Sequence, residues 1–234
     1  MLKKVLEELK SYGSEQSVRI YKNHGADIDL FGVKVGDIKK IAKKYKGNHE
    51  LGVQLLHSKN QDAIYLSQYV IDATRLTKQD FIDVIEATGS YMILEYCLPN
   101  LIVMEKKNMM NWIQEWIFSD NPRYQQVAWS TYSNALSYYP DDEFDLEDCH
   151  QKLDYVNEHI HVSENRTKYC MNGFVIACGS FVKELNIHAK IVADNIGKVE
   201  VMMGKTSCKV PLAYETIDKI EKKERLGKKR KNLC

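Results

Sequence analysis

An apolar stretch in the middle of the chain, ATGSYMILEYCLPNLIVM (Ala87–Met104), constrains the fold more than any other feature. It carries a single charged side chain, that of Glu95. A helix made from this stretch is apolar on nearly all sides, so neighbouring elements must pack on more than one of its faces. Tyr91 and Glu95 lie one turn apart and share a face. Because burying a bare carboxylate is costly, Glu95 belongs either to a structural ion pair or to a functional site.

Most of the chain shows helical periodicity in short segments that come in pairs and are joined by brief turns. Asn48 and Thr77 stand where helix N-caps are expected, and in the central stretch we expect Ser90 to be a cap. Pro99 should stop or kink that central helix, because proline lacks an N–H group. The pattern predicts an all-α fold, a HEAT-like α-solenoid of paired antiparallel helices. An irregular helical bundle is the alternative.

One segment near the C-terminus departs from this helical pattern. In KVEVMMGKTSCKV (Lys198–Val210), side chains alternate with a period of two on both sides of a turn that contains Gly204. Pro211 follows directly. The sequence therefore predicts one C-terminal β-hairpin, residues 198–211.

Composition is that of an ordinary globular protein. With 234 residues, 44% of them hydrophobic and 28% charged, the chain can bury a core as a single domain, residues 1–234. The charged start of the chain does not resemble a signal peptide, and no apolar run reaches membrane-spanning length. We expect a cytoplasmic protein with no membrane partner. The cysteines form no CxxC pair and are predicted to be reduced structural thiols: Cys97, Cys149, Cys170, Cys178, Cys208 and Cys234.

Charge is unevenly distributed although the formal net charge is only +1. The acidic segment, Pro140–Asp148, holds six acids in nine residues. Lys222–Lys231 holds seven basic residues against one acid, a local charge of +6, and leads into the basic tail, residues 224–234. The region around Lys39–Lys46 is also basic. Such local surfaces suit contacts with nucleic-acid phosphates. The predicted DNA-binding residues are Lys198, Lys205, Lys209, Lys228, Lys229, Arg230 and Lys231.

Motifs of cofactor and metal chemistry are missing from the sequence. There is no glycine loop for phosphates, no GxSxG, no HExxH and no Cys/His spacing typical of a metal site. His159 and His161 alternate without further nearby ligands, and Asp141–Glu143 lacks the glycine and terminal glutamate of a calcium loop. We therefore expect neither a metal nor a cofactor.

Two stretches resemble the DNA alkylation repair family, HEAT-like repeat proteins typified by the bacterial alkylpurine DNA glycosylase AlkD. YKNHGADIDLFGVKVGDIKKIAKKY (Tyr21–Tyr45) resembles the entry motif of that family, and LLHSKNQDAIYLSQYVID (Leu55–Asp72) resembles its next repeat. The ending GKVEVMMGKTSCKVPLAYETIDKI is similar to a hairpin in the AlkF/AlkG-like branch. The resemblance covers about residues 15–185. It implies an all-α solenoid whose basic concave face holds duplex DNA.

The resemblance also implies where a catalytic site would lie. Glycosylases of the family excise cationic N3- and N7-alkylated purines with a Trp and an Asp one turn apart, an Arg on a later helix and a second Trp. These positions fall on Tyr91, Glu95, Gln126 (or Gln125) and Phe174. All of them depart from the glycosylase pattern. A longer carboxylate side chain disturbs catalytic geometry, and glutamine does not replace the charge of arginine.

The sequence thus predicts a DNA-binding protein of the alkylation-repair superfamily. Its partner would be duplex DNA, damaged or branched, and its glycosylase activity would be weak or absent. One alternative is an active alkylpurine glycosylase that uses Glu95. Another is a protein–protein interaction scaffold, a common use of α-solenoids.

Overall fold

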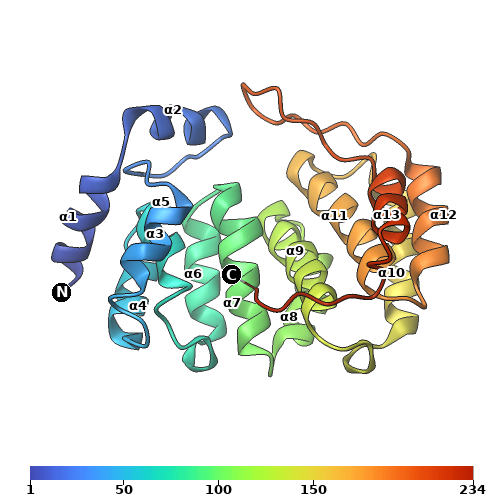
Figure 1. Ribbon diagram of the computed structural model, residues 1–234, viewed down its shortest axis with the longest axis horizontal. Coiled ribbons are helices and arrows are strands. Elements are labelled where there is room, and N and C mark those ends of the chain that lie inside the picture. The colour runs from blue at the N-terminus through green and yellow to red at the C-terminus, as the bar shows by residue number, and fades with distance from the viewer. Residues whose placement is uncertain (234) are drawn as a thin grey trace. The chain divides into compact units, whose positions relative to one another are not determined.

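The computed structural model describes residues 1–233 and shows the predicted all-α, HEAT-like fold (Figure 1). Cys234 lies outside the described residues. No helix within residues 1–233 has both the length and the apolar character needed to cross a membrane. The helices are α1 (Leu2–Tyr12), α2 (Glu15–Asn23), α3 (Val35–Ala42), α4 (His49–Leu56), α5 (Gln61–Ser67), α6 (Lys78–Ala87), α7 (Leu98–Glu105), α8 (Met109–Ile117), α9 (Pro122–Tyr138), α10 (Leu146–His159), α11 (Asn165–Phe181), α12 (Asn186–Ile196) and α13 (Ala213–Lys222).

The chain forms two compact units. The N-terminal unit comprises residues 1–109 and 203–207, and the C-terminal unit comprises residues 110–202 and 208–233. The prediction of a single domain over residues 1–234 stays a prediction.

The predicted N-caps at Asn48 and Thr77 are confirmed, because the signal for a helix cap is local. Asn48 accepts a hydrogen bond from the N–H of Leu51, and Thr77 forms a capping box with Asp80.

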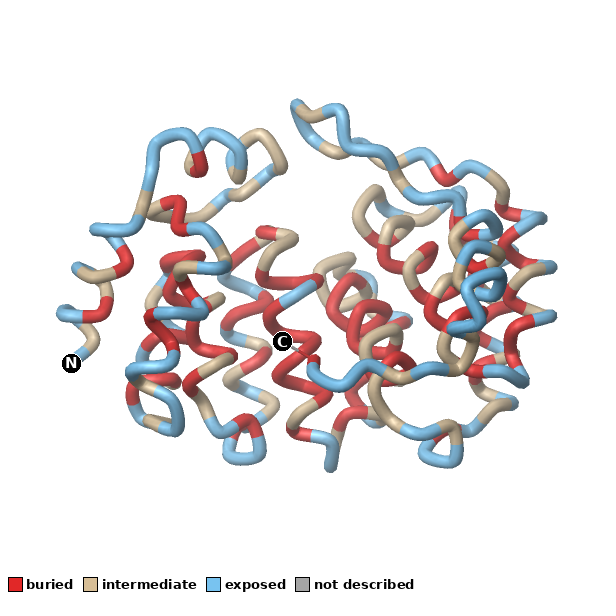
Figure 2. Tube along the Cα trace, in the orientation of Figure 1, coloured by how far each residue is buried: buried red, intermediate tan, exposed pale blue. Residues whose placement is uncertain are grey.

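In the N-terminal unit, α5 packs against α3, α4 and the segment that leads into α7. The apolar core beneath α1, α3 and α5 includes Leu9, Ile38, Leu55 and Leu66. The tube view shows that α7 is buried along most of its length (Figure 2). This agrees with the all-round apolar character of its sequence.

A buried carboxylate joins the two stretches that resemble the repair family. Asp62, at the start of α5, accepts hydrogen bonds from the backbone N–H groups of Phe31, Gly32 and Val33 at 2.6, 3.0 and 3.0 Å. Burial raises the pKa of Asp62, and the three N–H donors act in the opposite direction. Gly32 has a φ of +76°, and a Cβ atom there would lie 2.6 Å from the carbonyl oxygen of Ser14. The turn before α3 is therefore fixed by a carboxylate and a glycine.

The central stretch is helical but not a single α-helix. Residues Met92–Cys97 (η2) form a π-helical turn, and α7 follows with Pro99 in its first turn. The N–H of Leu98 bonds to the carbonyl of Ile93, five residues earlier. The predicted break near Pro99 is thus present as a change of helix type at Leu98, and the chain stays helical on both sides of it. The wider π turn ends where proline starts a new α-helix, a position at which its missing N–H costs nothing.

Ser90 stands directly before the helical turn, as predicted, and its carbonyl accepts hydrogen bonds from the N–H groups of Ile93 and Leu94, both at 3.0 Å. Its hydroxyl does not cap the helix; it donates to Gln61 Oε1 of α5 at 2.6 Å. A buried amide pair, Asn100 Nδ2 to Gln68 Oε1 at 2.9 Å, joins α7 to the end of α5. These contacts depend on the neighbouring helix and have no local sequence signal.

In the C-terminal unit, α9 and α11 make the most extensive helix–helix contact, and α12 and α13 both pack on α11. Phe174 of α11 lies between Trp129 and Tyr132 of α9, with ring centroids 5.0 Å apart in each case. All three rings are fully buried. These aromatic residues form the centre of the core of this unit.

The predicted β-hairpin is absent: residues 198–212 contain no strand, and in residues 1–233 only an isolated bridge joins Asp29 to Asn60. We call residues 198–212 the extended loop. Its backbone bonds elsewhere: Asn165 of α11 exchanges two hydrogen bonds with the backbone of Met202, at 2.6 and 2.8 Å. At the tip, the N–H of Lys205 bonds to the carbonyl of Asn23 at 2.8 Å. The backbone is extended here, as the period-two alternation suggests. However, pairing of two strands requires free backbone N–H and C=O groups, and at Met202 and Lys205 these groups bond to Asn165 and Asn23 instead.

Candidate nucleic-acid interface

Glu95 lies in the π turn of the N-terminal unit and is buried, with 4% of its surface exposed. Tyr91 stands one residue before this turn and is half-buried. The predicted pair is thus on one element, close to the start of α7. A π turn inside a helix is frequently found at functional sites, because it redirects side chains while keeping the backbone bonded. A buried carboxylate beside such a turn is a candidate site residue.

Two other aromatic rings lie against Tyr91. The His24 ring, just after α2, is 5.7 Å away between centroids, and the Tyr96 ring is 6.2 Å away in an edge-on arrangement. Tyr96 is 41% exposed. Neither residue was predicted from the sequence. For Tyr96, the only local signal was the aromatic content of the central apolar stretch, and aromatic residues in such a stretch indicate core more often than surface.

Gln126 lies on α9 in the C-terminal unit and is also buried. Its side-chain oxygen, Oε1, accepts no hydrogen bond from residues 1–233. A neutral amide at this position provides neither the charge nor the bidentate geometry with which arginine holds a phosphate. Gln125, the other position suggested by the resemblance, donates from its Nε2 to the carbonyl of Ser119 at 2.6 Å.

Phe174 is enclosed in the core of the C-terminal unit and has no exposed surface. Its ring packs on Trp129 and Tyr132, and Tyr132 in turn donates to Asp148 at 2.8 Å. Stacking of Phe174 on a nucleobase would require this core to open. Its predicted role at a catalytic site stays a prediction, and its observed contacts are those of a core residue.

Most of the predicted phosphate-binding side chains are exposed. Lys205, Lys209, Lys228, Arg230 and Lys231 all present more than a third of their surface to solvent. Lys198 is exposed as well and forms an ion pair with Glu200 at 3.0 Å.

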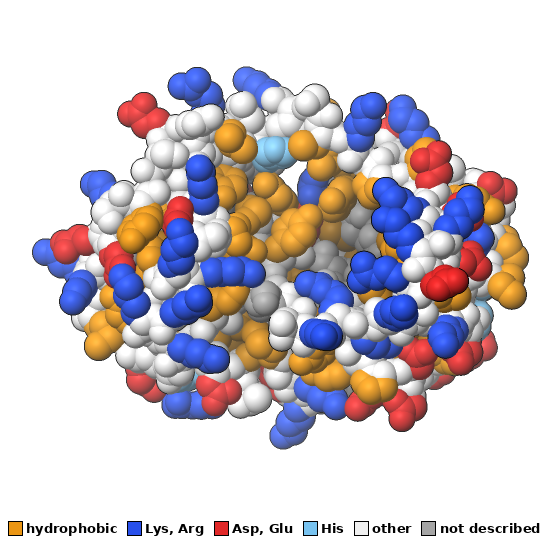
Figure 3. All heavy atoms as spheres, in the orientation of Figure 1, with side chains coloured by type: hydrophobic (Ala, Val, Ile, Leu, Met, Phe, Trp, Pro, Cys, Tyr) orange, Lys and Arg blue, Asp and Glu red, His pale blue; other side chains and the backbone are white. Residues whose placement is uncertain are grey.

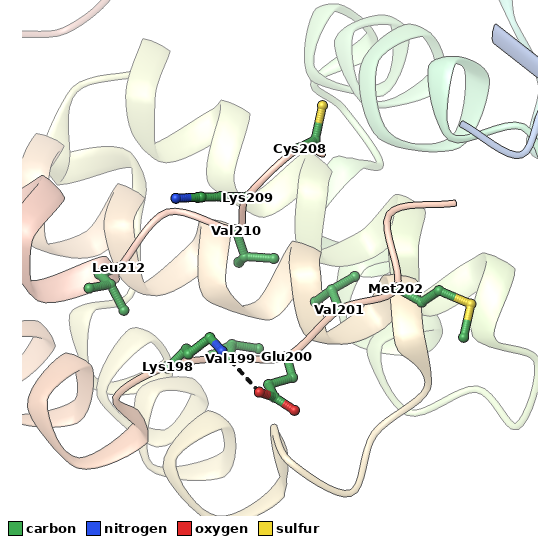
Figure 4. A pocket seen from close by; sticks show the side chains of 9 residues that line it. All are labelled: Lys198, Val199, Glu200, Val201, Met202, Cys208, Lys209, Val210 and Leu212. Atoms are coloured by element: carbon green, nitrogen blue, oxygen red, sulfur yellow. Dashed lines mark hydrogen bonds and ion pairs between the residues drawn. The ribbon is translucent and has the colours of Figure 1, made fainter. Parts of the chain in front are cut away.

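The two legs of the extended loop in the C-terminal unit border a cavity of about 710 Å³ (Figure 4). Val201 and Val210 line it from opposite legs, together with Lys198 and Lys209. Mixed lysine and valine side chains suit a ligand with both anionic and apolar parts.

Lys229 differs from the other basic residues of the tail. Its ammonium lies 2.6 Å from Asp141 of the acidic segment and donates to the carbonyl of Leu136 at 2.7 Å. The next residue, Arg230, donates its backbone N–H to Ser137 at 2.7 Å. The tail is therefore fastened to the end of α9 over these residues, and the acidic segment neutralises part of its charge. The sequence has no local signal for this pairing, because the tail and the acidic segment lie far apart in the chain.

Most of the cysteines in residues 1–233 are buried. Burial raises the pKa of Cys149 to about 11, and burial raises that of Cys178 as well, so both remain thiols at neutral pH. Cys97 and Cys170 are buried, and Cys208 is exposed.

His159 and His161, the weak metal candidates, contact the separate carbonyls of Tyr155 and Ile196. Within residues 1–233, no group of three or more His, Cys, Asp or Glu side chains could hold a metal ion.

Comparison with known proteins finds a matching family and similar bacterial proteins. Residues 5–189 match the family described as DNA alkylation repair enzyme. An uncharacterised protein of Listeria innocua is 33% identical over 217 residues, covering 91% of this chain and 93% of that protein. An uncharacterised protein of Listeria monocytogenes is 34% identical with the same coverage.

A solved structure extends the likeness to the whole fold. It is described as representing a new family of proteins related to the HEAT-like repeat DNA glycosylases with affinity for branched DNA structures. It superposes with a TM-score of 0.91 at 31% identity, covering 100% of this chain and 99% of that one. The chain belongs to the DNA alkylation repair enzyme family.

Proposed function

We propose that this protein binds DNA, duplex or branched, through exposed lysines, and that its alkylpurine glycosylase activity is weak or absent. The observation that carries the proposal is the full-length likeness to a structure whose protein is described as having affinity for branched DNA. Family membership supports a role on DNA. The basic concave groove expected from the family is part of this proposal.

Local charge supports the same proposal. Lysines at positions 34, 39, 40, 43, 44 and 46 follow one another on and beside α3 in the N-terminal unit. Lys and Arg side chains gather over this helix in the space-filling view (Figure 3). Lys40 and Lys44 are paired with Asp37 and Glu8, whereas Lys43 is exposed and has no ion pair within residues 1–233. Exposed ammonium groups displace counterions from phosphates, which dominates sequence-independent affinity.

DNA binding should therefore depend steeply on salt, and loss of lysines should flatten that dependence. We expect Lys205→Ala with Lys209→Ala to weaken binding to a fluorescein-labelled duplex in anisotropy titrations. Each lost phosphate contact lowers the slope of log K against log salt by about 0.9. Replacing Lys228 and Lys231 together tests the tail in the same way. Lys3→Ala with Lys4→Ala, two exposed lysines of α1, is the charge-matched control. If the slope of log K against log salt were the same as wild type in the Lys205/Lys209 and Lys228/Lys231 double variants, these lysines would be excluded as phosphate contacts.

A wild-type protein that binds neither duplex nor branched DNA would favour a scaffold for protein partners instead.

An active glycosylase is the second candidate, and the burial of Glu95 within a π turn favours it. A carboxylate can stabilise the positive charge that develops on the sugar as a cationic base leaves, an effect commonly worth a few kcal/mol. Glycosylase chemistry in this family, by resemblance, also uses the arginine that Gln126 replaces.

We expect release of N3-methyladenine and N7-methylguanine from methylated duplex to stay near background for the wild type. Glu95→Gln should then change nothing measurable, because no effective catalytic site is present to lose. Robust release that Glu95→Gln abolishes, with the circular dichroism spectrum unchanged, would instead make this protein an enzyme. Gln126→Arg tests whether the missing cation is the limiting group: an increase in release would locate the defect at that position.

A further inference from the structure

The three rings of His24, Tyr91 and Tyr96 form a partly exposed cluster in the N-terminal unit, which we call the aromatic platform. Tyr96 is 41% exposed, and His24 and Tyr91 are half-buried. The aromatic group of Trp112, Trp116 and Tyr124 in the C-terminal unit differs, because both tryptophans are buried.

The π turn is what brings Tyr96 to Tyr91. In a continuous α-helix, residues five apart point about 140° away from each other. In a π turn, with hydrogen bonds from residue i to i−5, each turn holds more residues, so residues five apart point in much more similar directions. The edge-on contact of Tyr91 and Tyr96 follows from this geometry. The turn thus accounts for a surface feature that an ordinary helix would not produce.

The segment that carries His24 is fastened beside the segment that carries Tyr91. Three residues further on, Asp27 accepts hydrogen bonds from the N–H of Gly89 at 2.7 Å and from the hydroxyl of Thr88 at 2.9 Å. These bonds tie the segment after α2 to the residues before Tyr91.

The tip of the extended loop, residues 203–207, lies against the same segment. A Cβ atom on Gly204 would lie 2.0 Å from the carbonyl oxygen of Asn23. Only glycine allows this approach, and φ at Gly204 is +68°. The exposed Lys205 follows directly, so a cation stands next in the chain to the residue that touches the His24 segment.

We propose that the aromatic platform stacks on an unpaired base at a branch point of DNA, with Lys205 as a neighbouring contact for the phosphate backbone. This rests on the proposed DNA-binding function and adds a reason for preferring branched over intact DNA. Every base has a π face, so stacking on aromatic rings is tolerant of sequence. In an intact duplex these faces are occupied by neighbouring bases. At a branch point, a terminal or unpaired base exposes one face.

The test uses DNA with 2-aminopurine, whose fluorescence falls when it stacks on an aromatic ring. One probe carries it unpaired at the centre of a three-way junction, and a second carries it paired within a duplex of the same sequence. Wild-type protein should quench the first probe and leave the second nearly unchanged. Tyr96→Ala and His24→Ala should remove the quenching and weaken junction binding about ten-fold each, the range of one lost base–aromatic stack. Tyr12→Ala is the matched control, because Tyr12 is an exposed tyrosine (45%) on α1 of the same unit.

The outcomes separate this inference from the proposed function. Tight, salt-dependent DNA binding with unchanged quenching and junction preference in Tyr96→Ala and His24→Ala would overturn the platform alone. No binding of wild type to either probe would overturn both proposals. Tyr96→Phe keeps a π face and should retain the quenching. Loss of quenching in Tyr96→Phe would show that the hydroxyl, not the ring, is what matters, and would also contradict the platform.

Discussion

Replacing Asp62 with alanine should lower the free energy of unfolding by about 3–5 kcal/mol, because three N–H groups, two of them buried, would lose their acceptor. Asp62 is 1% exposed, and its two oxygens accept all three hydrogen bonds from residues 31–33. Hydrogen bonds to a charged acceptor are stronger than neutral ones, and each unsatisfied buried donor carries a desolvation penalty. Asp62→Asn should be nearly as harmful, because its amide nitrogen would face an N–H donor instead of accepting from it.

Urea unfolding followed by circular dichroism measures this loss, and hydrogen exchange locates it. Faster exchange should appear first at the amides of Phe31, Gly32 and Val33. Asp83→Ala is the control, because this exposed carboxylate of α6 accepts one hydrogen bond from Gln79. A surface substitution of that kind should change the free energy of unfolding by no more than about 0.5 kcal/mol. Equal stability of Asp62→Ala and Asp83→Ala would show that the bonds at residues 31–33 contribute little.

Replacing Phe174 with alanine should cost about 3–5 kcal/mol of unfolding free energy, the range for removing a buried aromatic ring. The ring fills the space between Trp129 and Tyr132, so its loss leaves a cavity that these rigid rings fill poorly. Phe174→Trp, which restores the residue type of the family glycosylases, should also destabilise the protein. Added volume in a filled core costs about 1–3 kcal/mol.

Thermal unfolding and DNA titration together decide what Phe174 does. Phe181→Ala, on the same helix but only partly buried, should cost about 1–2 kcal/mol and serves as the control. At a temperature where Phe174→Ala is still folded, we expect its DNA affinity to equal that of wild type. A stable Phe174→Ala protein with selectively reduced DNA binding would mean that the ring reaches the DNA, against the burial seen here.

Local sequence signals predicted the elements that depend on neighbours within one turn. The capping box at Thr77 and the helical periodicity required only short-range spacing, and both appear in the structure. The resemblance at residues 21–45 and 55–72 led to the family to which the chain belongs. It also marked Tyr91 and Glu95 as a pair on one element, which the structure shows.

Other features were decided by contacts between distant residues. The alternation in residues 198–210 favours extended backbone, but Asn165 and the carbonyl of Asn23 take up groups that a hairpin would have paired. Lys229 was predicted as a phosphate contact from the charge of the tail, and its ion pair with Asp141 depends on where the tail returns to α9. Pairing of this kind has no local signal, because the partners lie far apart in the chain.

The sequence by itself determined the all-α class, the positions of most helices and the placement of one carboxylate in an apolar stretch. These follow from periodicity and from the cost of burying charge. Only the tertiary structure decided that a π turn precedes the helix with Pro99 in its first turn, that Asp62 holds the turn before α3, and that Phe174 is core. The physical reason is the same for all three. Each outcome depends on which surfaces and hydrogen-bonding groups neighbouring elements present, and those are set when the helices pack.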